Sequence, residues 1–196
     1  MSLPRDRSIR RLVPAEECFE SSPHLFALNK DGDRRSDMLC LSEPETVNIA
    51  VKTIKDTFRD NLDTLSFGFA PPDRFPMCYC QRCHDSIPEF NHKGYGDPSL
   101  SDLWFRFANC IAKEVYEEFP DRWVLTNGYA NRVRLPEGIA EFSPNLVFNP
   151  RLLLRVPFIM RVIKDADSIH FTNNCWIGGP IHSTVCLSMI MTRATL

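Results

Sequence analysis

The sequence predicts an α/β fold, barrel-type or doubly wound, in which helices surround a parallel sheet. Two observations support this prediction. Short apolar runs of strand length alternate with longer segments whose apolar residues recur every three or four positions. Proline, glycine and polar turn residues separate the two kinds of segment. This alternation of strand and helix is typical of a parallel sheet wrapped by helices.

The first predicted strand and helix follow one another early in the chain. The apolar run at 38–41 is a candidate buried strand, and residues 42–45 (Ser-Glu-Pro-Glu) form a capping box with proline in the first helical turn. The helix should end near Asp63. Residues 13–33, which precede this unit, are expected to be loop-rich and to lie outside the core. The expected buried stripe of the helix consists of Val47, Val51, Ile54, Phe58 and Leu62.

Further strands and a second long helix follow. The run at 64–70 alternates large apolar with small residues and stops at two prolines, which cannot continue a central strand. Strands are also expected at 123–129 and 145–149. A start signal at 97–99 predicts a helix between the first two of these strands. Its expected stripe consists of Trp104, Phe107, Ala108, Ile111, Val115 and Phe119.

The composition argues against several classes of partner. The formal net charge of −2 gives no footprint for nucleic acid, and the basic run lies within residues 1–11, which we expect to be disordered. No window approaches the roughly 18 uninterrupted apolar residues of a membrane span, and the first residues lack the apolar core of a signal peptide. We therefore expect no nucleic-acid partner, no membrane insertion and, for the chain as written, a cytoplasmic location.

The most distinctive stretch of the chain packs Cys78, Cys80, Cys83 and His84 closely together, shortly after the strand at 64–70. Thiolate and imidazole are preferred ligands of zinc, so this loop is a candidate zinc site. Four ligands so close in sequence rarely enclose a metal, because structural zinc usually draws on two separated pairs. A loop disulfide or free structural thiols is therefore the simpler interpretation, with zinc as the alternative.

The other cysteines add little to this interpretation. The eight cysteines are too scattered for a compact disulfide framework, and they leave the redox compartment open. Cys40 and Cys110 lie in apolar segments, where a buried free thiol is common.

Candidates for ligand binding or catalysis stand at the ends of the predicted strands. Asp73 lies just beyond the strand at 64–70, where a carboxylate suits acid–base work or sugar binding, although a turn aspartate that caps nearby amides explains it equally well. Asn127 and Tyr129 end the next strand and could hydrogen-bond to a sugar or stack on it, with packing at the strand end as the alternative. No second carboxylate that would complete a glycosidase pair stands out within residues 12–149.

Four stretches of the sequence, in their order and spacing, resemble one protein family. They are residues 12–17, 24–32, 39–45 and 73–83. The family is catalogued as domain of unknown function 4838, and in its members an aspartate precedes a Cys-x-Cys-x-x-Cys loop by five residues, as Asp73 precedes Cys78 here. Its members resemble glycoside-hydrolase barrels related to the α-glucuronidases. The resemblance covers residues 12–149 and implies part of a (β/α)8 TIM-type barrel that acts on carbohydrate.

A complete barrel of this kind needs about 250 residues, so the predicted strands account for about half of one. We therefore expect a fragment of a glycoside-hydrolase-like protein that binds or hydrolyses a glycan, inactive by itself and prone to self-association. Residues 150–196 show neither a capped helix nor a steady period, and we hypothesise that the reading frame shifts near residue 149. The alternative is a non-catalytic α/β module whose loop from Cys78 to His84 holds a structural metal or mediates binding.

Overall fold

A computed structural model describes residues 8–72, 77–87, 99–132 and 136–150, together with the backbone of two short strands near the C-terminus. The elements are the 3-10 helices η1 (Ile9–Arg11), η2 (Pro23–Leu25) and η3 (Ala130–Arg132), the α-helices α1 (Ala15–Cys18), α2 (Pro44–Asp60), α3 (Gln81–Asp85) and α4 (Ser101–Glu118), and the strands β1 (Phe26–Leu28), β2 (Arg34–Leu39), β3 (Ser66–Gly68), β4 (Trp123–Gly128), β5 (Leu146–Pro150), β6 (Lys164–Asp165) and β7 (Ser168–Ile169).

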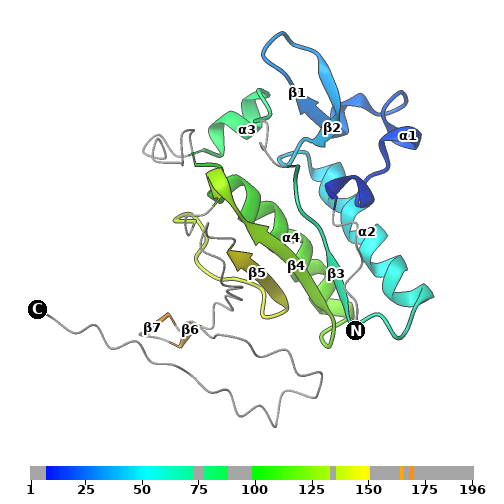
Figure 1. The fold of residues 1–196 in the computed structure, drawn as a ribbon, viewed down its shortest axis with the longest axis vertical. Coiled ribbons are helices and arrows are strands. Elements are labelled where there is room, and N and C mark those ends of the chain that lie inside the picture. Colours follow the sequence, from blue (N-terminus) through cyan, green and yellow to red (C-terminus); the bar gives the residue numbers. More distant parts are fainter. Residues whose placement is uncertain are drawn as a thin grey trace, which may run out of the picture.

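The centre of the fold is a parallel sheet of β3, β4 and β5, in that order (Figure 1). Phe67 of β3 pairs with Val124 of β4, and Val124 pairs in turn with Leu146 of β5. All three strands coincide with apolar runs that the sequence predicts as strands, β5 reaching one residue beyond its run, and α4 connects β3 to β4 as a crossover helix. The mixed α/β class with a parallel sheet is thus confirmed. The described strands form an open sheet, and closure into a barrel stays a prediction.

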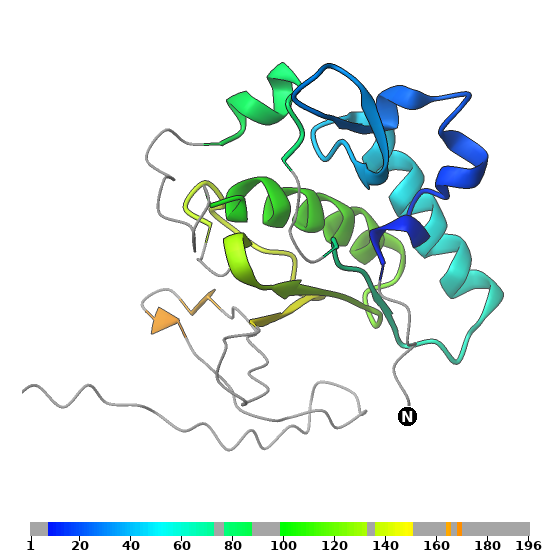
Figure 2. The ribbon, with the colours of Figure 1, turned by 45° about the horizontal axis from the view of Figure 1, so that its top comes forward.

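The two long helices cover one face of this sheet (Figure 2). α4 packs against β4 and β5, and α2 packs against α4. Phe69, directly after β3, is 1% exposed and lies against α4, with its ring centroid 5.7 Å from that of Trp104 and 6.1 Å from that of Phe107. Both rings meet Phe69 edge-on, an arrangement that aromatic pairs favour. The core of the domain therefore lies between the sheet and these helices.

The ends of α2 differ from the prediction. Glu43, and not Ser42, is the N-cap, and it makes no side-chain capping bond, so the predicted capping box does not form. The Glu43 carboxylate instead pairs with Arg82, close to the start of α3. The helix ends at Asp60, which leaves Leu62 outside it and 73% exposed. The stripe that is fully buried runs along successive turns through Thr46, Ala50, Ile54 and Phe58.

A β-hairpin of β1 and β2 stands apart from the parallel sheet. Phe26 pairs with Leu39 and Leu28 with Arg34, in antiparallel register. The Asn29 side chain accepts hydrogen bonds from the backbone N–H groups of Asp31 and Asp33, which fixes the turn between the strands. The predicted buried strand at 38–41 is confirmed for Met38 and Leu39, which end β2 and are each 2% exposed. The strand belongs to this antiparallel hairpin and not to the parallel sheet, and Cys40 and Leu41 follow it.

The chain before α2 contributes to the core, contrary to the expectation of a loop-rich segment outside it. Leu25 and Phe26 are each 1% exposed, and Ile9 is fully buried. We expected residues 1–11 to be disordered, but Ser8 forms a parallel bridge with Ala70 and the Ile9 N–H donates to the Ala70 carbonyl at 2.8 Å. The apolar Ile9 side chain, embedded in a basic run, anchors this segment beside β3. Within the described part of the chain, every helix is too short or too polar to span a membrane.

Candidate metal centre

Four cysteine side chains converge where the hairpin meets the loop after β3. They are Cys40, Cys78, Cys80 and Cys83, and their Sγ atoms all lie within 4.8 Å of one another. The Sγ atom of Cys40 lies 3.6 Å from that of Cys80 and 3.8 Å from those of Cys78 and Cys83. Cys40 is therefore the member that joins the other three.

Separate elements position these sulfur atoms. Cys40 directly follows β2, and its N–H donates to the Leu25 carbonyl at 2.8 Å. Cys78 and Cys80 lie in the loop that leads to α3, and Cys83 lies within α3. This loop runs beside β1, because the Tyr79 N–H donates to the Leu28 carbonyl at 2.9 Å. The cluster thus ties the hairpin to the segment that connects β3 with α4.

Hydrogen bonds within the cluster concentrate negative charge on Cys78. The thiols of Cys40 and Cys83, together with the backbone N–H groups of Cys80 and Leu28, lower the pKa of Cys78 well below the usual thiol range. The Leu28 N–H lies 3.2 Å from the Cys78 Sγ atom. The hydrogen bond to Cys78 in turn raises the pKa of the Cys40 thiol. These hydrogen bonds favour the thiolate form of Cys78, and thiolate is the form in which cysteine binds metals.

The structure changes the predicted ligand set. It brings together the predicted Cys78, Cys80 and Cys83, but the His84 side chain is 72% exposed and its Nδ1 atom lies 3.8 Å from an Asp85 carboxylate oxygen. His84 is outside the cluster, because α3 turns its side chain toward solvent while Cys83 faces inward. Cys40 takes the fourth position. Its sequence signal was a cysteine at the end of an apolar run, which by itself indicates only a buried thiol.

The cluster contains no disulfide, and the described cysteines are all free thiols. A disulfide needs a sulfur–sulfur distance of about 2.05 Å, well below the distances found here. Cys110, which we expected to be buried, is exposed on α4, because the neighbouring Asn109 and Ile111 occupy the buried side of the helix. Among the described cysteines, only the cluster is therefore a candidate for metal binding.

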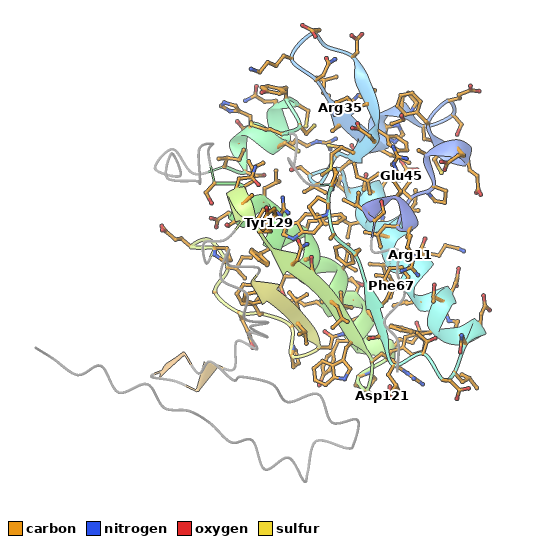
Figure 3. All side chains as sticks on the ribbon, in the orientation of Figure 1. Arg11, Arg35, Glu45, Phe67, Asp121 and Tyr129 are labelled. Atoms are coloured by element: carbon orange, nitrogen blue, oxygen red, sulfur yellow. The ribbon has the colours of Figure 1, made fainter. Side chains whose placement is uncertain are left out.

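The predicted sugar-binding residues belong to a different element from the cluster cysteines, in β4 and directly after it. Asp73 falls outside the described residues. Asn127 lies near the C-terminal end of β4, and Tyr129 follows the strand directly (Figure 3). The Asn127 Oδ1 atom is buried and has no hydrogen-bond partner in the described part of the chain. Ala130, with φ of 53°, adopts the left-handed conformation that non-glycine residues rarely take.

Fold and cluster together define an α/β domain with a candidate tetrathiolate metal centre. Residues 5–149 match the family described as "Domain of unknown function (DUF4838)". Since this match covers most of the chain, the protein belongs to that family, as the sequence resemblance indicates. A search of curated proteins finds no match.

Proposed function

We propose that Cys40, Cys78, Cys80 and Cys83 hold a structural zinc ion that fastens the hairpin to the parallel sheet. The observation that carries this proposal is the spacing of the sulfur atoms. In a tetrahedral site with zinc–sulfur bonds of about 2.3 Å, the sulfur atoms lie about 3.8 Å apart. The Cys40 Sγ atom lies 3.6 to 3.8 Å from the other three. Three of the six sulfur–sulfur distances therefore match a tetrahedral site, and the other three are no longer than 4.8 Å.

A closed, buried ligand set supports a structural rather than a catalytic role. Catalytic zinc keeps a position open for water or substrate, whereas structural sites use four protein ligands, often four cysteines. Cys40, Cys78 and Cys83 are each no more than 3% exposed, so solvent has little access to the ion they would hold. Soft thiolate ligands favour zinc over magnesium or calcium, which prefer oxygen.

The zinc content of the purified chain tests this proposal directly. We expect about one zinc per chain, because four thiolates complete one tetrahedral site. Cys40→Ser should lower the zinc content and weaken the thiolate charge-transfer bands of the cobalt-substituted protein. His84→Ala and Cys110→Ser should leave both unchanged. Loss of zinc in His84→Ala, with retention in Cys40→Ser, would show that the sequence-predicted ligand set is the true one.

A separate observation favours a second proposal, which concerns the C-terminal end of β4. We propose that this end belongs to the glycan-binding surface of a glycoside-hydrolase-like barrel, of which the present chain is an inactive part. Support comes from the buried, unpartnered Oδ1 atom of Asn127, because such an acceptor is costly unless a ligand hydroxyl satisfies it. Tyr129 supplies a partly exposed ring, and aromatic rings with a polar tip suit sugar faces. The left-handed backbone of Ala130 is of the strained kind that gathers at functional sites.

Titration of the chain with a panel of soluble oligosaccharides, followed by calorimetry, tests this second proposal. Asn127→Ala and Tyr129→Ala should each abolish the binding. Tyr116→Ala is the matched control, since Tyr116 lies exposed on α4, away from the strand ends. Asp73→Asn extends the test to the predicted carboxylate. Binding that survives in both Asn127→Ala and Tyr129→Ala would refute the placement of the surface.

A further inference from the structure

The four thiols of the centre differ in their access to solvent. Cys40, Cys78 and Cys83 are buried, whereas Cys80 is partly exposed. All four cysteines are thiolates when they bind zinc, so in the proposed centre the exposure of each residue decides which is oxidised first. A small oxidant such as hydrogen peroxide therefore reaches the sulfur of Cys80 before the other three.

The Cys80 Sγ atom lies 3.6 Å from the Sγ atom of Cys40. Closing this gap to a disulfide of about 2.05 Å needs a movement of about 1.5 Å. Both residues lie beside regular elements rather than inside them, since Cys40 follows β2 and Cys80 precedes α3. The backbone can therefore make this movement without breaking a helix or a strand.

We propose that the centre is a reversible redox switch in which a peroxide joins Cys80 to Cys40 and releases zinc. This inference rests on the proposed zinc centre. In the first step the Cys80 thiolate attacks a peroxide oxygen, the O–O bond breaks, and sulfenic acid and hydroxide form. In the second step the Cys40 thiolate attacks the Cys80 sulfur, the S–O bond breaks, and a disulfide and a second hydroxide form. Two thiolates are oxidised by two electrons, and one peroxide is reduced.

The consequence for the metal differs from the consequence for the fold. After oxidation only Cys78 and Cys83 remain as thiolates, and two ligands do not close a tetrahedral zinc site. The disulfide, however, spans the same 40 positions of sequence between Cys40 and Cys80 that the zinc ion bridged. The hairpin stays fastened to the loop before α3. Oxidation should therefore release zinc without the loss of stability that removal of zinc from the reduced protein brings.

Peroxide titration of the zinc-loaded chain tests the inference, with a chromogenic chelator to count released zinc and peptide mapping to locate the disulfide. We expect one zinc released per Cys40–Cys80 disulfide, a melting temperature close to that of the zinc form, and recovery with a thiol reductant and added zinc. Zinc release without a disulfide, a disulfide between another pair, or an oxidised protein that melts like the reduced, chelated one would overturn it. A purified chain that takes up no zinc would instead refute the proposed centre itself.

Two variants sharpen the test. Cys80→His keeps a zinc ligand, because sites with three cysteines and a histidine are common, but it removes the accessible thiol. Its zinc release by peroxide should be at least about tenfold slower than that of the unmodified chain. Cys110→Ser removes an exposed thiol outside the cluster and should release zinc at the unmodified rate. Equal rates in Cys80→His and the unmodified chain would overturn the inference, and disulfide mapping of the unmodified chain decides the question if Cys80→His loses its zinc.

Discussion

If the proposed centre holds zinc, removal of the metal from the reduced protein should destabilise the domain by an amount set by the length of chain between the linked cysteines. Cys40 and Cys80 are 40 positions apart in sequence. Cross-linking two residues at that separation removes about 13 cal/mol/K of conformational entropy from the unfolded chain, or about 4 kcal/mol at 25 °C. For a domain of this size, about 2–4 °C of melting temperature corresponds to each kcal/mol, so the expected loss is about 8–16 °C.

Thermal unfolding followed by circular dichroism, at fixed protein concentration and with a thiol reductant present, measures this loss. One sample carries equimolar zinc and the other an excess of a zinc chelator. His84→Ala should show the full shift, because His84 lies outside the cluster. Cys40→Ser should melt low in both samples, since it lacks the ligand that joins the hairpin to the loop. A shift below about 3 °C in the unmodified chain would refute the cross-link argument, because it would correspond to no more than about 1.5 kcal/mol.

Three further predictions concern packing, pH and assembly. Phe69→Ala should lower the free energy of unfolding, measured in urea, by about 3–5 kcal/mol, because it empties a site enclosed by two aromatic rings. Leu62→Ala, at an exposed residue, should change that free energy by less than about 0.5 kcal/mol. The hydrogen bond from Arg35 lowers the pKa of the Asp37 carboxyl group. This pair therefore stabilises the fold above the unfolded pKa of aspartate, and its contribution is lost as the pH falls through the lower folded pKa. Asp37→Asn should flatten the acid side of a plot of melting temperature against pH, and an unchanged slope would contradict the assignment. The chain should self-associate in light scattering, because the outer edge of β5 is unpaired within the described residues, and a monodisperse monomer would refute this prediction.

The local elements of the fold were predictable because their signals are local. The strands β3, β4 and β5 lie in short apolar runs, and the period of apolar residues marks α2 and α4. Each signal depends on neighbours a few positions away, which the sequence displays directly. The start of α2 was less predictable. Its N-cap, Glu43, pairs with Arg82 from another part of the sequence and makes no side-chain capping bond to its own helix.

The sequence alone determined that Cys78, Cys80 and Cys83 lie close together in one segment and that strands of a parallel sheet precede and follow it. Only the tertiary structure decided the fourth member of the cluster. His84 is adjacent in sequence, but the short helix α3 directs it to solvent, whereas Cys40 arrives from 38 positions away through the pairing of β1 with β2. Contacts across such separations depend on how whole elements pack, because helix and strand periodicity specifies which side of an element is buried and leaves open which partner buries it.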